Sequence, residues 1–386
     1  MRNKKTEDRS QKSEVRVSLL SSVFCPLFSV FCLLSSVFLA FASEETSFEE
    51  FPIPTPLSSP TDIVVDRSGI VWVMEYNANK IGRLDPSRNI FEEFEITTSK
   101  SEATDMTIDK DGNLWFTEQE GNQVGKFNTR TLKFEEFELP VPNSNPASIT
   151  VDAKGNIWFV EWNRNKITKF TPPPHSPPPH KGGGEPIQRM GWGRFVEYDI
   201  PTPMSQPSGL VCDSKGNIWF AEKGGNKIGM LNHETGIIKE YEIKPELSMP
   251  IGAVIDSKGN IWFCKLKDKK LVRFNPHTGE FKDFSLPGIK GAQSMAIDKG
   301  DNIWLALRYE DKIIRFEPDS ENFTEYNITA KDSQPLAIAV DLKGNVWFTM
   351  IKGNKIGKLD LSKINIASKK SDLKVKMTPP ANILRK

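Results

Sequence analysis

The sequence is poor in cysteine and histidine and has almost no net charge. It contains four cysteines and four histidines, with 51 Lys and Arg residues against 50 Asp and Glu. A net charge of +1 gives the chain no overall field that would attract nucleic acid or an anionic membrane. Cys25 and Cys32 fall in an N-terminal apolar segment, while Cys212 and Cys264 occupy unlike points of neighbouring repeats. Because unlike positions share no disulfide geometry, we expect two buried free thiols in the body of the protein.

The first 42 residues differ in composition from all that follows. A charged start precedes an apolar run over residues 17–41, and Ala40-Phe41-Ala42 fits the small-x-small rule for signal-peptide cleavage. We therefore predict that residues 1–42 are a signal peptide and that the protein is exported to the bacterial periplasm or the cell exterior. The run is also long enough to span a bilayer, so a retained N-terminal membrane anchor stays open as the alternative.

Tryptophan recurs at an almost constant spacing within a repeated phrase. The intervals are 43, 43, 61, 43, 42 and 43 residues, and the fullest phrase reads Asp-x-x-Gly-Asn-Ile-Trp-Phe, then Glu, Asn-Lys-Ile-Gly-x-Leu and Phe-x-Glu-Phe-x-Ile-Pro. Each copy holds four short β-patterned runs, which in the second copy are 106–109, 114–118, 124–127 and 134–139. Four antiparallel strands at this period form a propeller blade, so we predict an all-β, seven-bladed β-propeller over residues 43–364. We expect the repeated tryptophans to pack between blades; they are Trp72, Trp115, Trp158, Trp219, Trp262, Trp304 and Trp347.

The fourth-strand signature occurs only six times after the first repeat begins. The seventh copy is Phe48-Glu-Glu-Phe-Pro-Ile53, whereas the chain after Leu361 carries no such strand. Pairing of residues 48–53 with blade 7 would join the ring and remove an exposed edge. We therefore predict closure by the N-terminal strand and a basic, disordered tail over residues 365–386.

The one long interval contains an insertion in blade 3. Residues 171–193 are rich in proline and glycine and cannot bury a core, so we expect a loop between the third and fourth strands. His175 and His180 lie in this loop, where nothing fixes their geometry for a metal. We interpret both as solvated linker residues.

The phrases Gly-Asn-Ile-Trp-Phe-x-Glu, Asn-Lys-Ile-Gly-Arg-Leu and Glu-Phe-x-Ile-Pro-Thr-Pro closely resemble repeats of the virginiamycin B lyase (streptogramin lyase) family across all seven copies. The resemblance implies a seven-bladed propeller that opens a cyclic depsipeptide antibiotic by metal-assisted elimination. It also implies a histidine base and a magnesium-binding group on the face opposite the Asp-x-x-Gly-Asn turns. The family's histidines fall in Pro-His-Gly-Ile or Pro-His-Ala-Ile, just before the first strand of the last two blades.

Those family positions carry no histidine in this chain. The base positions fall on Gln293 and Leu336, and the positions of the acidic residues fall on Gln334 and Ile351. Without a base that titrates near neutral pH or a carboxylate for the metal, the elimination has no visible machinery. Two further histidines, which the repeats place in solvated turns on the other face, are His233 and His277.

The face predicted to be functional is asymmetric. Blades 1 to 4 carry a glutamate three positions after the repeated tryptophan, blades 1 and 2 add an aspartate before the first strand, and basic residues gather on blades 5 and 6. Such a mouth could hold a polar, zwitterionic ligand or a divalent cation, Mg²⁺ or Ca²⁺, with aromatic residues as stacking surfaces. The candidate ligand-binding residues are Glu75, Glu118, Glu161, Glu222, Asp62, Asp105, Lys265, Arg308, Tyr76 and Trp162. The candidates for a metal, if one binds, are Glu75, Glu118, Asp62 and Asp105.

The glutamates also have a structural interpretation. A lysine begins the third strand of blades 1, 3 and 4, namely Lys80, Lys166 and Lys227. Each lies close to the glutamate that ends the second strand, so the two could form exposed ion pairs worth about 0.2–1 kcal/mol. The Asp of the Asp-x-x-Gly-Asn turn occurs in every blade, so we interpret it as a turn residue and not a metal ligand.

These observations favour an exported, monomeric propeller that binds a small polar ligand, a glycan or an envelope protein through its asymmetric face. We expect no nucleic-acid partner, no organic cofactor and no membrane contact beyond residues 17–41. One alternative is a divergent metal-dependent lyase acting on a cyclic ester, or a lactonase-like hydrolase. Another is a structural module of the cell envelope.

Overall fold

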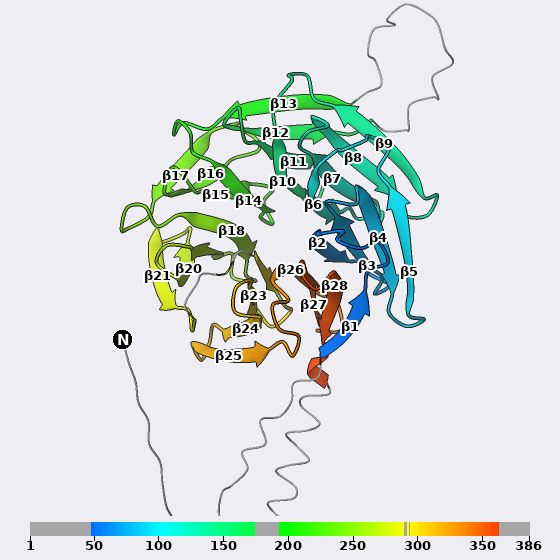
Figure 1. Cartoon of the computed structure of the whole chain (residues 1–386). Helices are drawn as coiled ribbons and strands as arrows, with labels where there is room; N and C mark the ends of the chain where they lie inside the picture. The colour runs from blue at the N-terminus through cyan, green and yellow to red at the C-terminus, as the bar shows by residue number, and fades with distance from the viewer. Residues whose placement is uncertain (1–47, 174–192, 289–291, 293, 363–386) are drawn as a thin grey trace, which may run out of the picture. The chain divides into compact units, whose positions relative to one another are not determined.

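The computed structural model describes residues 48–173, 193–288, 292 and 294–362. The expectations for residues 1–42, for most of the 171–193 loop and for residues 365–386 lie outside this part of the chain. Within it, no helix has the length and apolar character needed to cross a bilayer. Seven four-stranded antiparallel sheets follow one another around a ring, as Figure 1 shows. The predicted seven-bladed β-propeller is confirmed.

The first four blades follow the chain in order, each with its first strand nearest the centre (Figure 1). Their strands are β2 (Pro60–Val65), β3 (Val71–Glu75), β4 (Lys80–Asp85) and β5 (Ile90–Glu95) in blade 1; β6 (Ala103–Ile108), β7 (Leu114–Glu118), β8 (Gln123–Asn128) and β9 (Lys133–Glu138) in blade 2; β10 (Pro146–Val151), β11 (Ile157–Glu161), β12 (Lys166–Thr171) and β13 (Arg194–Asp199) in blade 3; and β14 (Pro207–Cys212), β15 (Ile218–Glu222), β16 (Lys227–Leu231) and β17 (Ile238–Glu242) in blade 4.

Blades 5 and 6 repeat this order, and blade 7 combines the two ends of the propeller. Their strands are β18 (Pro250–Ile255), β19 (Ile261–Lys265), β20 (Lys270–Asn275) and β21 (Glu280–Ser285) in blade 5; β22 (Ser294–Ile297), β23 (Ile303–Leu307), β24 (Lys312–Glu317) and β25 (Asn322–Asn327) in blade 6; and β26 (Pro335–Val340), β27 (Val346–Met350), β28 (Lys355–Leu359) and β1 (Phe48–Pro52) in blade 7.

The N-terminal strand closes the ring as predicted. Strand β1 pairs antiparallel with β28, in a register that places Phe48 opposite Leu359 and Pro52 opposite Lys355. Its Phe51 ring lies 5.8 Å from the indole of Trp347, between centroids. Closure therefore supplies both the last ladder of hydrogen bonds and part of the core between blades 7 and 1.

The second strand of every blade is buried along its whole length because it lies between two neighbouring blades. The repeated tryptophans are between 0% and 4% exposed. Each packs against the next blade: Trp72, for example, clusters with Leu114, Phe116 and Phe127. The predicted role of the tryptophans in packing between blades is confirmed.

The Asp-x-x-Gly-Asn turn joins this core to one face of the ring. In blade 1 the amide of Gly69, at φ +86°, donates to the carbonyl of Asp66 over 3.0 Å. In all seven blades the turn aspartate also accepts a hydrogen bond from the tryptophan indole, at 2.9 to 3.4 Å. The turn residue and the packing residue therefore form one unit, which the sequence pattern had left as two separate features.

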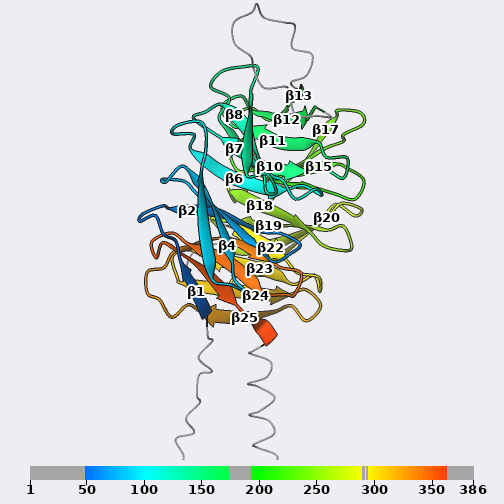
Figure 2. The same ribbon diagram turned by 90° about the vertical axis from the view of Figure 1, so that its right-hand side faces the viewer.

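The loops of the ring fall on two faces, seen edge-on in Figure 2. In blade 1, Pro60 pairs with Glu75 at one end of β2 and β3, and Val65 pairs with Val71 at the other. The loop before the first strand and the loop after the second strand therefore share a face, which we call the upper face. The Asp-x-x-Gly-Asn turns lie on the opposite face.

Candidate functional site

The upper face opens into a central cavity of about 610 Å³. It is lined by the start of the first strand of several blades and by the residue that follows the second strand. The lining residues on which its chemistry depends are Asp62, Asp105, Gln119, Ser148, Trp162, Gln206, Lys223, Ile251, Leu266, Met295, Leu336 and Ile338.

A bulge near the start of most first strands aims one residue at the cavity. The pairing register shifts between Pro60 and Asp62, and again at the matching point of blades 2, 3, 4, 5 and 7. Blades 4 and 5 hold Gly209 and Gly252 at this point, at φ +61° and +65°. A Cβ atom on Gly209 would lie 2.5 Å from the Cα of Gly252, so this close approach requires glycine.

Asp62 and Asp105 occupy the same position in blades 1 and 2 and meet at the wall of the cavity. Asp62 Oδ2 accepts a hydrogen bond from the amide of Met106 at 2.7 Å, and Asp105 Oδ2 accepts one from the amide of Ile149 at 3.3 Å. Burial raises the pKa of both groups, and the charge of Asp105 raises the pKa of Asp62 further, well above its usual range. Two like charges in a buried site disfavour each other, so the neutral form of Asp62 is favoured beside Asp105.

Blades 5 to 7 line the cavity mostly with apolar side chains, although Ser294 is polar. Ile251 and Leu266 of blade 5, Met295 of blade 6, and Leu336 and Ile338 of blade 7 line the cavity. Trp162 stands at the rim of blade 3, with 45% of its surface exposed. The cavity thus combines a pair of carboxyl groups with a mostly hydrocarbon lining, an arrangement suited to an amphipathic ligand.

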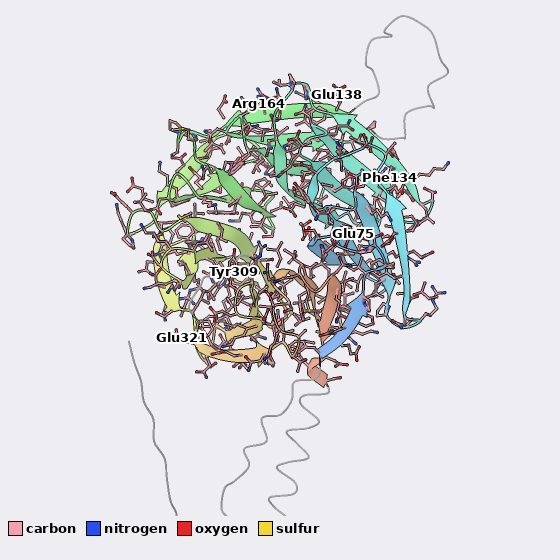
Figure 3. The ribbon with its side chains drawn as sticks, viewed as in Figure 1. Glu75, Phe134, Glu138, Arg164, Tyr309 and Glu321 are labelled. Carbon is pink, nitrogen blue, oxygen red and sulfur yellow. The ribbon has the colours of Figure 1, made fainter. Side chains whose placement is uncertain are left out.

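The four glutamates predicted for the mouth do not line the cavity. Each is fully buried where it ends the second strand; these residues are Glu75, Glu118, Glu161 and Glu222. Glu75 lies among the strands of blade 1, whereas Glu321 lies at the outer edge of the ring (Figure 3). Neighbouring residues of a strand point in opposite directions, so the glutamate points between blades and the next residue points to the mouth.

The predicted exposed pairs between these glutamates and the lysines of the third strand are not formed. Lys80 Nζ instead contacts Glu93 of the fourth strand at 2.9 Å, and Lys227 contacts Glu240 at 2.6 Å. Neither carboxylate oxygen of Glu75 or of Glu222 has a hydrogen-bond partner among the described residues. Burial, aided by the charge of the neighbouring fourth-strand glutamate, raises the pKa of Glu75 to about 7 and that of Glu222 to about 8.

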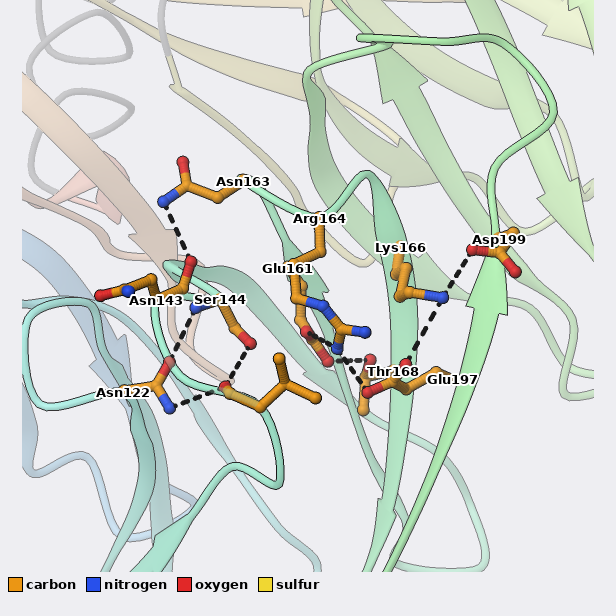
Figure 4. Close-up of polar contacts among 11 residues, drawn as sticks. Asn122, Asn143, Ser144, Glu161, Asn163, Arg164, Lys166, Thr168, Glu197 and Asp199 are labelled. Atoms are coloured by element: carbon orange, nitrogen blue, oxygen red, sulfur yellow. Dashed lines mark hydrogen bonds and ion pairs between the residues drawn. The ribbon is translucent and has the colours of Figure 1, made fainter.

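Blade 3 satisfies its buried glutamate in a different way. Arg164 donates to Glu161 at 2.8 Å and to Glu197 at 2.5 Å, while Thr168 Oγ1 donates to Glu161 at 2.5 Å (Figure 4). Lys166 reaches Asp199 at 2.5 Å. The Arg164 guanidinium and the Thr168 hydroxyl group thus give Glu161 the hydrogen-bond partners that Glu75 and Glu222 lack among the described residues.

The other predicted ligand-binding residues divide between the mouth and the core. Trp162 lines the cavity, whereas Tyr76, at the equivalent place in blade 1, is half-buried and does not line it. Lys265 is 1% exposed and donates to Asp283 and to the carbonyl of Lys244, so it is a core residue and not part of a basic mouth. Arg308 donates to the side-chain oxygen of Gln334 at 3.4 Å.

Several residues of the cavity were not predicted from the sequence. Gln119 and Lys223 line it one position after the second-strand glutamate, and Ser148 lines it at the position of Asp62. Gln119 and Lys223 could have been predicted, because they occupy the same repeat position as Trp162 and Tyr76, which were predicted to bind ligand. Met295 carries no polar group and gave no signal of its own.

The positions of the family's base and metal ligand do not suit those roles. Leu336 and Ile351 have no donor atom, and Gln334 has the Arg308 guanidinium beside it, where a divalent cation would be repelled. Gln293 lies outside the described residues. His233 lies in the turn between β16 and β17, with a side chain only 12% exposed and packed against Gly216, so the prediction of a solvated histidine was wrong.

The two body cysteines are free, as predicted. Cys264 is buried, whereas Cys212 is only partly buried. Burial raises the pKa of the Cys264 thiol to about 12 and that of Cys212 to about 11. Neither thiol ionises near neutral pH, so neither is a nucleophile in the resting protein.

The same architecture occurs in solved lyase structures. The structure of a streptogramin B lyase superposes with a TM-score of 0.72 and 30% identity, over 82% of this chain and 99% of that chain. Virginiamycin B lyase from Staphylococcus aureus superposes with a TM-score of 0.71 and 27% identity, over 81% of this chain and 98% of that chain. The model of the virginiamycin B lyase family matches residues 40–175 and 183–369. The chain belongs to the virginiamycin B lyase family.

Sequence similarity to a curated member of the virginiamycin B lyase family is local. A segment of 45 residues is 49% identical to virginiamycin B lyase of Bacillus licheniformis and covers 12% of this chain and 15% of that relative. A catalytically inactive histidine-to-alanine variant of the S. aureus enzyme has been solved with quinupristin; it is 27% identical to this chain. The extracellular domain of a two-component system of B. thetaiotaomicron, 16% identical with a TM-score of 0.63, shares the fold alone.

Proposed function

We propose that this member of the virginiamycin B lyase family binds an amphipathic small molecule in its central cavity and does not catalyse the family's elimination. The observation that carries the proposal is the cavity itself, with the Asp62–Asp105 pair on one wall and Ile251, Leu266 and Met295 on the other. A cavity of about 610 Å³ lies in the range of small-molecule sites, which are about 300–1,000 Å³.

The chemistry of the walls defines the class of ligand. The oxygen atoms of the Asp62–Asp105 pair can accept hydrogen bonds, so an ammonium group or a hydroxyl donor fits this wall. The apolar wall and the Trp162 rim would take an aromatic or aliphatic body, since stacking and burial of apolar area favour both.

The absence of catalysis rests on the residues at the family positions. Leu336 and Ile351 have neither a titratable group nor a donor atom, and no described residue of the cavity lining is a histidine. Elimination needs a base that accepts a proton and a group that stabilises the developing anion. In the S. aureus relative, replacement of one histidine by alanine gives a catalytically inactive protein.

The test uses quinupristin and two small probes, tryptamine and its neutral counterpart indole-3-ethanol. Calorimetry and mass spectrometry of the purified protein would measure binding and ring opening separately. We expect saturable binding of an amphipathic amine, tighter for tryptamine than for indole-3-ethanol, with the mass of quinupristin unchanged. Trp162→Ala and Asp62→Asn should each weaken binding at least about tenfold, corresponding to about 1.4 kcal/mol.

A matched control is Tyr309→Ala, because Tyr309 is 52% exposed but does not line the cavity. Ring opening of quinupristin would overturn the proposal in favour of a divergent lyase. If none of the probes bound, the proposed amphipathic site would be rejected and a structural role in the envelope would be favoured.

We also propose that the protein works outside the cytoplasm. The support is the apolar run over residues 17–41 and the small-x-small cleavage pattern that ends at Ala42. Fractionation of cells that express the full chain tests this: the protein should appear in the periplasm or medium, shortened at its N-terminus. Recovery in the cytoplasm at full length would contradict it.

A further inference from the structure

Blades 1 and 4 each hold a lysine ammonium group within a cage of oxygen atoms. Lys80 Nζ lies 2.9 Å from Glu93 Oε2 and 2.9 Å from Thr55 Oγ1. Lys227 Nζ lies 2.6 Å from both Glu240 Oε2 and Thr202 Oγ1. The buried second-strand glutamate of each blade, Glu75 or Glu222, faces the same ammonium group, whose charge lowers the glutamate pKa. In these blades a cation is a built-in part of the interface.

Blade 2 has the same cage without the lysine. Thr98 donates through its amide to Glu136 Oε1 at 3.0 Å and through Oγ1 to Glu136 Oε2 at 2.9 Å. The corresponding bonds from Thr202 to Glu240 are both 2.9 Å, so the cage is built alike. The residue at the position of the lysine is Gln123, which pairs with Glu118 in the strand register. A neutral amide therefore stands where the neighbouring blades have a positive charge.

Glu118 lies next to this cage, within reach of the charge of Glu136, and has no hydrogen-bond partner among the described residues. It is fully buried, and neither of its carboxylate oxygens has a hydrogen-bond partner within the described part of the chain. A Cβ atom on Gly121 would lie 3.1 Å from Glu118 Oε2 and 3.3 Å from Thr98 Cγ2. Glu222 and Thr202 converge in the same way on Gly225, at 2.7 and 2.9 Å. Glu118 Oε2 and the methyl group of Thr98 therefore lie on either side of the same small space beside Gly121, and Glu136 is near enough for its charge to act on Glu118.

The charge of the cage is not balanced by the protein. Burial and the charge of the nearby Glu136 together raise the pKa of Glu118 to about 8. No cation among the described residues lowers it. The nearest lysine along β8, Lys126, pairs with Glu135 instead. Two carboxylates without a cation in a buried interface are strongly unfavourable unless a proton or an ion joins them.

We propose that Glu118, Glu136 and Thr98 form a calcium site between blades 1 and 2, at the place that a lysine ammonium group holds in blades 1 and 4. Two carboxylates and a hydroxyl group are hard oxygen donors, which suit Ca²⁺, and bidentate carboxylates with water complete the six to eight ligands it takes. A divalent ion also neutralises both carboxylates, which a monovalent ion cannot do. Glu136 is half-buried and so leaves a path from solvent. This site is separate from the central cavity and does not rest on the proposed function.

The ion would tie the loop of blade 1 that carries Thr98 to the strands of blade 2 that carry Glu118 and Glu136. Because Ca²⁺ would bind the folded ring and not the unfolded chain, its binding should raise the unfolding temperature.

The experiment titrates the purified, metal-free protein with CaCl₂ and follows binding by calorimetry and unfolding by differential scanning calorimetry. We expect one saturable site in the micromolar to millimolar range and a rise in unfolding temperature. Glu118→Gln should weaken Ca²⁺ binding at least about tenfold, or about 1.4 kcal/mol. Glu222→Gln, the same change in a blade that already holds a lysine, should leave binding unaltered.

A second variant separates loss of the site from loss of the fold. Gln123→Lys restores the residue of blades 1 and 4, so it should abolish Ca²⁺ binding while the ring stays at least as stable as the metal-free parent. The proposal is overturned if millimolar Ca²⁺ neither binds nor raises the unfolding temperature. It is also overturned if binding survives in both Glu118→Gln and Gln123→Lys, if Asp62→Asn removes it, or if Na⁺ or K⁺ binds in place of Ca²⁺.

Discussion

The indole nitrogen of Trp158 donates a hydrogen bond to Asp152 Oδ2 over 2.9 Å, and both side chains are buried. Asp152 also accepts from the amides of Lys154 and Asn156 and from the side chain of Asn156, at 2.8 to 2.9 Å. These bonds lower the pKa of Asp152 although its burial alone would raise it. One aspartate therefore holds both the turn and the tryptophan that packs against blade 4.

Asp152→Ala should destabilise the propeller by about 2–4 kcal/mol, because it leaves several buried donors without an acceptor. The measurement is urea unfolding followed by tryptophan fluorescence. Asp319→Ala is the control, because the Asp319 side chain is 95% exposed and its change should be within about 0.5 kcal/mol of the parent. Equal effects of the two substitutions would contradict this role of Asp152.

The propeller should lose stability as pH rises from about 5 to 8. Glu75, Glu118 and Glu222 have pKa values of about 7, 8 and 8 in the folded protein against 4.5 for a free glutamate. Their protonated forms stabilise the fold fully below the unfolded pKa, and this stability is lost as pH rises through the folded pKa. Each group contributes about 1.4 kcal/mol per pH unit within its window.

Urea unfolding at several pH values in metal-free buffer checks this dependence. Glu222→Gln should flatten the slope, because the amide has no proton to lose, whereas Glu242→Gln, at a side chain 71% exposed, should keep the parent slope. Stability that increased between pH 5 and pH 8 would rule out protonated glutamates in the interfaces. Carboxylates whose pKa is lowered, such as Glu93, change the stability only below about pH 5, so they do not mask the loss of stability between pH 5 and 8.

Phe51→Ala should weaken closure of the ring by about 3–5 kcal/mol. Phe51 is only 9% exposed, and it packs on Trp347 and on the core shared by blades 7 and 1. Hydrogen exchange should show faster exchange in β1 and β28 before the rest of the ring. Ile90→Ala, at a residue 43% exposed, serves as the control, and uniform exchange in the Phe51 variant would argue against local opening.

Gly125→Ala should destabilise blade 2 by about 1–3 kcal/mol through overpacking. A Cβ at this position would lie 2.1 Å from the ring of Phe116, which is fully buried in the core. Gly353→Ala is the control, because its nearest neighbour would be 3.4 Å away. Thermal unfolding of the two variants measures the difference, and an unchanged midpoint for Gly125→Ala would show that the Phe116 ring can shift.

The sequence by itself determined the ring. The spacing of Trp72 and its six counterparts fixed the number of blades, and the misplaced copy of the fourth strand identified β1 as the closing strand. Such features are readable because every blade must bury a large apolar residue at the same depth, and because an unpaired strand edge must be covered.

The tertiary structure alone decided what the polar residues do. Glu118 and Gln119 are neighbours in the sequence, yet one points between blades and the other into the cavity, because successive side chains of a strand face opposite sides. The ion-pair partner of Lys80 likewise depends on the neighbouring strand. Lys80 pairs with Glu93 of the fourth strand, and the buried Glu75 has no hydrogen-bond partner among the described residues. Repetition determines where a residue stands in its blade, but its charge environment depends on the neighbouring strand and the neighbouring blade.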